Sequence, residues 1–149
     1  MDRDHIIETV DRLFIATDQH DWNALFEIFD AHVLLDYTSM VGGQPATLDP
    51  AQIISSWKRL LPGFDHTHHQ TGNHIVHLKN EDADVFCYGT ATHYLENESN
   101  SNVWIVVGSY DFHLKKQDGR WKVSRMKFNL KYLDGNSDLP GMAQKRIPA

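Results

Sequence analysis

Residues 102–132 have the sequence NVWIVVGSYDFHLKKQDGRWKVSRMKFNLKY, and this stretch decides the fold. It holds two long runs in which apolar side chains recur at alternate positions, separated by the turn-forming residues 117–119 (QDG). Such alternation is typical of a strand with one buried face, and an Asp-Gly step favours a tight turn between antiparallel strands. We therefore predict two strands, over residues 102–116 and 120–132, joined as a hairpin.

Two further long strands are predicted immediately before this hairpin. Residues 66–78 and 83–95 alternate in the same way, with turn-forming residues between them at 79–82 and after them at 96–100. All four strands exceed the ~5–6 residues of an ordinary strand. Because long strands usually curl, we expect a curved antiparallel meander.

The first third of the chain predicts helices. Apolar residues recur at steps of three and four over residues 6–17, which is typical of a helix with one buried stripe. Asp21 and the pair Asp49-Pro50 have the chemistry of helix starts and predict a second and a third helix. A short strand is expected around residues 33–37.

Helices followed by an antiparallel meander are typical of an α+β domain. We predict a cone-shaped α+β barrel, in which three N-terminal helices pack on a strongly curved, mainly antiparallel sheet that encloses a pocket. Residues 1–134 would form this single domain, since domains commonly contain ~100–150 residues. Residues 135–149 are rich in Gly, Pro and polar groups and are expected to form a C-terminal tail that serves as a pocket lid or an interface segment.

The composition argues against several classes of protein. A formal charge of −6 disfavours nucleic-acid binding, which needs clustered Lys and Arg. No segment approaches the ~18 consecutive apolar residues of a membrane-spanning helix, and the acidic N-terminus does not resemble a signal peptide. The single cysteine, Cys87, cannot form an internal disulfide and favours a reducing compartment. We expect a cytoplasmic protein that binds neither nucleic acid nor membrane.

The two faces of the predicted sheet differ in character. The face that carries Gly89 and Ala91 is assigned to the cavity, because small residues leave room for a ligand. Val103, Ile105 and Val107 are expected on the opposite, outer face. An apolar outer face favours a homo-oligomer, a dimer or a trimer, that associates through it. The alternative is a helix that covers this face.

Five of the ten histidines lie within residues 66–77, which raises the question of a metal site. On a strand, His66 and His68 would share one face while His69 would lie on the other. Two histidines on one face, without a third ligand, are a weak metal signal. We therefore predict that the protein binds no metal.

Acid–base catalysis is the second interpretation of these histidines. By alternation, His69 and Asn73 share a face, and His93 lies on the predicted cavity face of the next strand. Histidine is a natural general base near neutral pH, but it needs a partner that fixes its tautomer. Asp18, on the inner side of the first helix, is the obvious partner, although it could equally cap the loop before Trp22.

Two tyrosines, Tyr37 and Tyr110, could donate hydroxyl hydrogens to a substrate carbonyl, although the residues alone are equally consistent with core packing. The residues that we expect to contact a substrate are Tyr110, Trp104, Asn73, Phe128 and Thr17.

Several short motifs resemble scytalone dehydratase. They are residues 16–22 (ATDQHDW), 35–37 (LDY), 67–72 (THHQTG), 92–94 (THY) and 118–123 (DGRWKV). Their order and spacing agree over residues 6–133, so the chain resembles that dehydratase and, more widely, the SnoaL-like members of the nuclear-transport-factor-2-like superfamily. The resemblance implies the cone-shaped fold predicted above.

The resemblance also implies a chemistry. It places a catalytic Asp–His pair at Asp18 and His69, a second histidine at His93, and a carbonyl-polarising tyrosine at Tyr37. Hexachlorocyclohexane dehydrochlorinase is similar at the first two positions. These relatives perform eliminations, with neither a metal nor an organic cofactor implied. The chain is thus expected to be a dehydratase-like lyase for a small, mostly apolar hydroxy-carbonyl compound.

Two alternatives stay open beside the lyase. One is an isomerase or polyketide-cyclase-like enzyme that uses the same base, and the other is a non-catalytic small-molecule-binding or assembly module. The chain also departs from scytalone dehydratase: Thr17 replaces a tyrosine, and Gly108 and Tyr110 replace a serine and an asparagine. Because those residues contact the substrate in the family, a different substrate is expected here.

Overall fold

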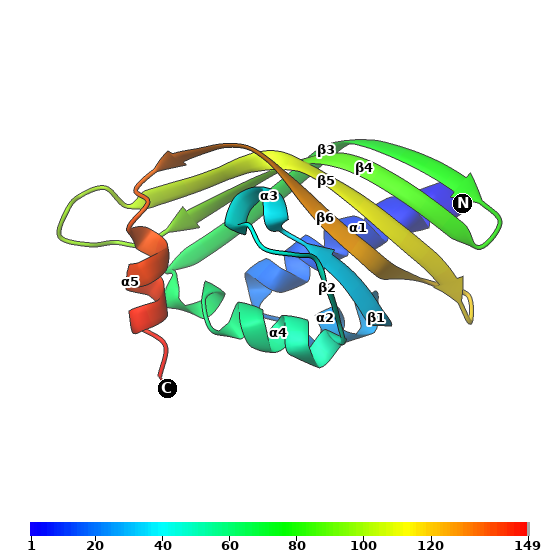
Figure 1. The fold of residues 1–149 in the computed structure, drawn as a ribbon, viewed down its shortest axis with the longest axis horizontal. Helices are drawn as coiled ribbons and strands as arrows, with labels where there is room; N and C mark the ends of the chain where they lie inside the picture. Colours follow the sequence, from blue (N-terminus) through cyan, green and yellow to red (C-terminus); the bar gives the residue numbers. More distant parts are fainter. Residues whose placement is uncertain (149) are drawn as a thin grey trace.

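One curved, unclosed sheet of six strands is lined by helices on its inner face in this computed structural model, which describes residues 1–148 (Figure 1). The strands are β1 (Phe29–Asp36), β2 (Ala46–Leu48), β3 (His66–Lys79), β4 (Asp82–Tyr94), β5 (Val103–Gln117) and β6 (Arg120–Gly135). The helices are α1 (Asp2–Gln19), α2 (Trp22–Ile28), α3 (Thr38–Val41), α4 (Pro50–Lys58) and α5 (Leu139–Lys145), with a single 3-10 turn η1 (Leu61–Gly63). The predicted α+β cone is confirmed.

The strand order is β2-β1-β6-β5-β4-β3, so the four long strands form the predicted antiparallel meander. The β5–β6 turn is formed by Asp118 and Gly119, with φ angles of 51° and 79°. Two successive residues with positive φ are what a tight hairpin turn requires, and Asp-Gly supplies them at low cost. The single parallel pairing, between β1 and β6, brings the end of β1 against the middle of the sheet.

Two of the N-terminal helices, α2 and α4, begin where side-chain chemistry predicts. Asp21 caps α2 by accepting from the Ala24 N–H at 3.2 Å. Asp49 caps α4 and forms a reciprocal capping box with Gln52. Helix α1 ends in a left-handed residue, His20, with φ 56°. Because Asp21 caps α2, the carboxylate of Asp18 is not needed as a cap and can form other contacts.

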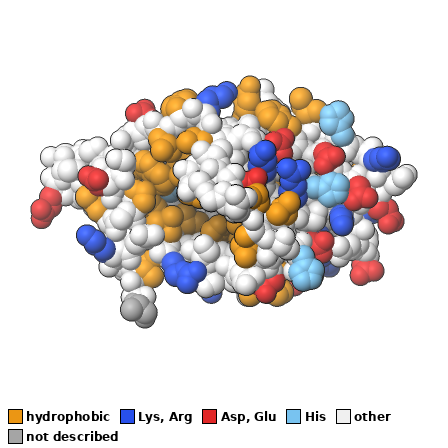
Figure 2. Space-filling view, in the orientation of Figure 1, with side chains coloured by type: hydrophobic (Ala, Val, Ile, Leu, Met, Phe, Trp, Pro, Cys, Tyr) orange, Lys and Arg blue, Asp and Glu red, His pale blue; other side chains and the backbone are white. Residues whose placement is uncertain are grey.

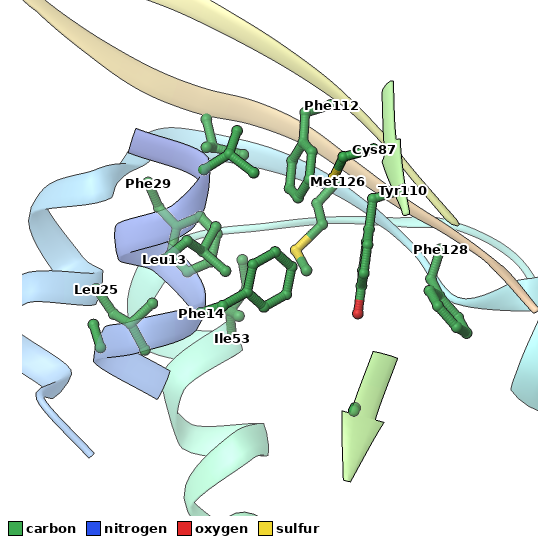
Figure 3. Close-up of a cluster of buried hydrophobic side chains, with 14 of the residues drawn as sticks. Leu13, Phe14, Leu25, Phe29, Ile53, Cys87, Tyr110, Phe112, Met126 and Phe128 are labelled. Carbon is green, nitrogen blue, oxygen red and sulfur yellow. The ribbon is translucent and has the colours of Figure 1, made fainter. Parts of the chain in front are cut away.

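The core lies between the helices and the concave face of the sheet (Figure 3). Leu13 and Leu25 reach it from α1 and α2, and both are fully buried. Phe29 and Met126 meet them from β1 and β6. Full burial of such a side chain stabilises the fold by about 1.5–3 kcal/mol each. This packing fixes α1 against the sheet and therefore fixes the position of its C-terminal end.

A β-bulge in β3 changes which residues face inward. The pairing with β4 shifts register between Gly72 and Ile75, and Asn73 has a φ of 58°. An extra residue in one strand reverses the alternation beyond it. His74 therefore faces α1, whereas Asn73 is exposed. The prediction that Asn73 shares the inner face with His69 is wrong for this reason.

Residues 139–145, inside the segment expected to be a tail, form the helix α5. Leu139 and Ala143 are fully buried, and Arg146 binds Asp65 at 2.9 Å. A Cβ at Gly63 would lie 2.0 Å from the Ala143 carbonyl oxygen, so only glycine allows η1 and α5 to approach this closely. Strand β6 also extends to Gly135, beyond the predicted end at residue 132.

The outer face of the sheet has one apolar end. Val103, Ile105 and Val107 are half-buried there, and the neighbouring side chains of Tyr88 and Tyr132 are about half exposed. The helices lie on the opposite face, so within residues 1–148 the alternative of a covering helix does not hold. Association through this face stays a prediction. In the same described part of the chain, no helix combines the length and apolarity that crossing a membrane requires.

Candidate active site

A cavity of about 350 Å³ lies between the concave sheet and the helices α1, α3 and α4. Figure 2 shows a hollow with hydrophobic walls on this side of the molecule. Its walls are formed by Phe14, Thr17, Leu35, Tyr37, Met40, Val41, Ser56, Trp57, Leu60, Leu61, His69, Ala91, His93, Trp104, Val106, Tyr110, Met126 and Phe128. No Lys, Arg, Asp or Glu stands among these described lining residues, so the cavity presents imidazoles and hydroxyls in largely apolar surroundings.

Asp18 lies directly behind this wall and is held by three donors of β3. Its carboxylate accepts from the Thr67 hydroxyl at 3.0 Å and from the His69 backbone N–H at 2.7 Å. The third contact joins Asp18 Oδ1 to His69 Nδ1 at 2.7 Å. A carboxylate at the C-terminal end of a helix opposes the helix dipole. These hydrogen bonds offset that disadvantage and fix the imidazole.

The contact with Asp18 determines the tautomer of His69. A carboxylate can only accept, so Nδ1 carries the hydrogen and, in the neutral ring, Nε2 keeps its lone pair. Because His69 lines the cavity while Nδ1 is bound to Asp18, Nε2 is the nitrogen that is available to a ligand. Phe14 stacks on the ring at 5.3 Å between centroids and limits its rotation.

His93 is the second imidazole of the cavity and is only 5% exposed. Its Nδ1 lies 3.1 Å from the carbonyl oxygen of Trp104, which can only accept, so this nitrogen also carries a hydrogen. Burial lowers the pKa of His93 to about 4. The ring is therefore neutral near pH 7 and offers Nε2 as an acceptor. Its centroid lies 6.1 Å from that of His69.

Tyr37 and Tyr110 place two phenols in the same cavity, with their hydroxyls close enough to influence each other. Burial raises the pKa of both hydroxyls well above the usual value for tyrosine. Both therefore stay protonated and can act only as neutral hydrogen-bond donors and acceptors near pH 7. Phe128 packs against both rings, at 5.7 Å and 4.9 Å between centroids.

The remaining residues that we expected to contact a substrate divide into two groups. Trp104 and Phe128 line the cavity, as does the buried Thr17. The Thr17 hydroxyl donates to the Leu13 carbonyl at 2.7 Å, so its hydrogen is not available to a ligand. Asn73 is exposed and lies outside the cavity wall.

Several lining residues were missed by sequence reasoning. Met40 belongs to α3, a one-turn helix whose four residues carry no periodic signal. Trp57 and Leu60 come from α4 and the turn after it, where apolar residues at helical spacing do not distinguish a core from a cavity wall. Helix α5, proposed as a lid, contributes none of the described lining residues. Within residues 1–148, no three His, Cys, Asp or Glu side chains are grouped so that they could hold a metal ion.

The model of the SnoaL-like domain family matches residues 1–127. The chain belongs to this family. Among curated protein sequences, no relative was found. The structure of the Kfla4162 protein from Kribbella flavida aligns with a TM-score of 0.87 and 22% identity, covering 96% of this chain and 97% of that one.

Two solved structures with named activities share the SnoaL-like fold. A candidate scytalone dehydratase from Novosphingobium aromaticivorans aligns with a TM-score of 0.76 and 18% identity, over 91% of this chain and 87% of that chain. A hexachlorocyclohexane dehydrochlorinase, LinA-type3, from Novosphingobium barchaimii aligns with a TM-score of 0.75 and 14% identity, over 91% and 90%. The fold is thus one that small-molecule enzymes use, and the reaction of this chain must be argued from its own site.

Proposed function

We propose that this SnoaL-like protein is a cofactor-independent lyase that eliminates water from a small, uncharged hydroxy-carbonyl compound. The observation that carries the proposal is the 2.7 Å contact between Asp18 Oδ1 and His69 Nδ1 at the wall of an apolar cavity. An imidazole that is fixed at Nδ1 and has Nε2 left for a ligand is a suitable general base. The names of the two similar structures, a dehydratase and a dehydrochlorinase, are consistent with elimination.

The first step is removal of a proton from the carbon next to the carbonyl. His69 Nε2 accepts this proton, and the resulting imidazolium is stabilised by the Asp18 carboxylate at Nδ1. One positioned base of this kind accelerates a reaction by about 10²–10⁴-fold. The electrons of the broken C–H bond move onto the carbonyl oxygen and form an enolate.

The enolate oxygen needs a hydrogen-bond donor, and Tyr37 is suited to supply it. Burial keeps the phenol protonated by raising its pKa, so it donates without transferring its proton. A donor that is already in place for the developing charge stabilises the transition state at little reorganisation cost. Tyr110, whose hydroxyl interacts with that of Tyr37 in the same cavity, supports this donor.

The second step expels the hydroxyl group. The imidazolium of His69 returns its proton, through Nε2, to the departing hydroxyl; the C–O bond breaks, a C=C bond forms, and water leaves. Both proton transfers use the same nitrogen, so they occur on the same side of the substrate. Neutral His93 accepts a hydrogen bond from the hydroxyl and orients it, because its pKa of about 4 prevents it from acting as an acid near pH 7.

The proposed substrate is uncharged because of the composition of the cavity wall. The described lining residues include no Lys or Arg to bind a carboxylate or a phosphate. Burial of an unpaired charge in such surroundings would be costly. A volume of about 350 Å³ lies at the lower end of the ~300–1,000 Å³ usual for ligand pockets, which favours compounds of one or two rings.

The test is product analysis with β-hydroxycyclohexanone as the probe. We expect the conjugated cyclohexenone, lighter by the mass of one water, to form with the wild-type protein and not with His69→Ala. Thermal unfolding of both proteins shows whether the variant is folded. If wild type and variant form the enone at the same rate, His69 is not the base.

A second candidate, an isomerase that uses the same base, is favoured by one observation. His93 is neutral and the phenols are weak acids, so the cavity holds no strong proton donor besides protonated His69. Isomerisation needs only removal and return of a carbon-bound proton. Conversion of β,γ-unsaturated cyclohexenone to the conjugated isomer, with no elimination from the β-hydroxy ketone, would identify this reaction.

A further inference from the structure

Two glycines face each other across the centre of the sheet, and an aromatic ring lies over each of them. Gly89 on β4 pairs with Gly108 on β5. A Cβ at Gly89 would lie 2.3 Å from Tyr110 Cε2, and a Cβ at Gly108 would lie 2.1 Å from the Asn129 carbonyl oxygen and 2.7 Å from Phe128 Cζ. The expectation that Gly89 leaves room for a ligand is therefore corrected: a ring of the protein occupies the space.

Each ring lies diagonally over the glycine of the neighbouring strand. Tyr110 pairs in register with Cys87 but leans over Gly89, two residues along β4. Phe128 pairs with Tyr110 and leans over Gly108 in the same sense. Glycine in a strand commonly marks such a close approach by another group, and an aromatic neighbour covers the exposed backbone.

The result is that the Tyr110 ring has little freedom. It is packed between Phe14 and Phe128, both at 4.9 Å between centroids, and Gly89 lies beneath its edge. Figure 3 shows the ring standing off the sheet with its hydroxyl directed away from the strands. That hydroxyl interacts with the hydroxyl of Tyr37, which follows β1 and lines the same cavity.

The two hydroxyls keep a donor for a ligand. Each phenol has one hydroxyl hydrogen, so when one of the pair donates to the other, the hydrogen of the acceptor stays free. Burial raises the pKa of both phenols, so both keep their hydrogens near pH 7. One hydroxyl hydrogen of the pair then remains available to a ligand.

We propose that Gly89 is a positioning residue, whose missing side chain sets the Tyr110 hydroxyl against Tyr37 so that the two phenols bind a substrate carbonyl as one unit. This inference rests on the proposed function for the identity of the ligand. In a chain of hydrogen bonds each donor polarises the next, so a correctly placed pair of hydroxyls donates more strongly than a single phenol. The residue at position 89 thereby influences which carbonyl compounds the cavity accepts.

The direct test is a pair of crystal structures, of Gly89→Ala and of the control Gly72→Ala. A Cβ at Gly72 would meet nothing within 4 Å, so the control should leave the cavity unchanged. In Gly89→Ala we expect the Tyr110 ring to turn into the cavity and its hydroxyl to leave Tyr37. An unmoved ring with an intact hydroxyl pair would overturn the proposal.

A rescue variant covers the case in which Gly89→Ala does not fold. The three atoms nearest to the added methyl group all belong to the Tyr110 ring, so adding Tyr110→Leu should remove the clash and restore cooperative unfolding. If the double variant also fails to fold, the glycine serves the backbone rather than Tyr110, and the proposal is wrong.

A binding cycle tests the functional part without requiring turnover. Affinity for β-tetralone, a neutral bicyclic ketone, is measured by calorimetry for wild type, Gly89→Ala, Tyr110→Phe and the double variant. Each single variant should weaken binding by about 3–10-fold, as loss of one hydrogen bond does. The double variant should bind β-tetralone no more weakly than the weaker-binding of the two single variants. If the two losses of affinity multiply instead, Gly89 and Tyr110 act independently and the proposal is contradicted. If the wild-type protein binds β-tetralone but shows no lyase activity, only the proposed lyase function is refuted.

Discussion

Helix α1 carries two aspartates that each bind one threonine and one histidine of β3, yet only one of these pairs meets the cavity. Asp18 belongs to the site described above. Asp11, about two helical turns earlier, accepts from the Thr71 hydroxyl at 2.7 Å and lies 3.1 Å from His74 Nε2. The same residue types thus meet twice along one helix–strand interface.

Burial does not distinguish the two histidines, because the side chains of His69 and His74 are both 13% exposed. The difference lies in which nitrogen is bound and what surrounds the ring. Asp18 is 17% exposed and binds Nδ1 of His69, whose ring lines the cavity. Asp11 is 38% exposed and binds Nε2 of His74, whose ring lies outside the cavity wall. An Asp–His contact becomes a candidate site only where a free nitrogen faces a space that holds a substrate.

The largest expected effect comes from removing each imidazole in turn. His69→Ala should lower kcat/KM for β-hydroxycyclohexanone by about 10²–10⁴-fold, since the general base is lost. His74→Ala should change kcat/KM by less than about twofold. Rate assays on both variants, with thermal unfolding as the folding control, check this. Equal losses would mean that the two pairs do not differ in function.

His93, which lies beside the Asp18–His69 pair, should make the stability of the protein depend on pH. Because burial depresses the pKa of His93 from 6.5 to about 4, the unfolded chain binds this proton first as the pH falls. The free energy of unfolding should therefore be highest above about pH 6.5 and should decrease as the pH approaches 4. The decrease should be at most about 3 kcal/mol. Urea denaturation of wild type and His93→Gln over this range checks the slope, which the variant should reduce.

Replacing the carboxylate of each pair should have a smaller effect than removing the imidazole. Asp18→Asn keeps an oxygen acceptor but no charge to stabilise a protonated imidazole, so kcat/KM should fall by about 10–100-fold. Asp11→Asn should leave kcat/KM unchanged and cost about 1 kcal/mol of stability. Initial rates and urea midpoints for both variants separate the two roles; a rate loss in Asp11→Asn would contradict the account.

The smallest expected effect concerns the bulge that creates the second pair. Asn73 is exposed with a φ of 58°, a conformation that glycine adopts freely. Asn73→Gly should therefore change stability by less than about 1 kcal/mol and leave kcat/KM within about twofold. A strong loss of rate would restore Asn73 as a substrate contact.

The sequence was informative where a single local rule acts. Alternation over the four long segments predicted the meander, and the chemistry of Asp21 and Asp49 predicted two helix starts. The contact between Asp18 and His69 was implied by the resemblance to scytalone dehydratase, whereas the residues alone left capping of the next loop equally open.

The features that could not be predicted depend on events between elements. The bulge at Asn73 reverses the alternation, which hid the pairing of His74 with Asp11. The close approach of Tyr110 to Gly89 depends on how a ring leans across two strands, and no pattern within one strand reveals that. Helix α5 forms in a Gly- and Pro-rich segment because Ala143 can pack against η1.

The most direct measurement of the central claim is exchange of the carbon-bound hydrogens of β-tetralone in deuterated water, followed by mass spectrometry. Exchange requires the base and the enolate-binding phenol but no leaving group. We predict fast exchange with wild type, exchange at the rate of the protein-free solution with His69→Ala, and wild-type exchange with His74→Ala. Exchange that survives the loss of His69, or that is absent from wild type, would contradict the account.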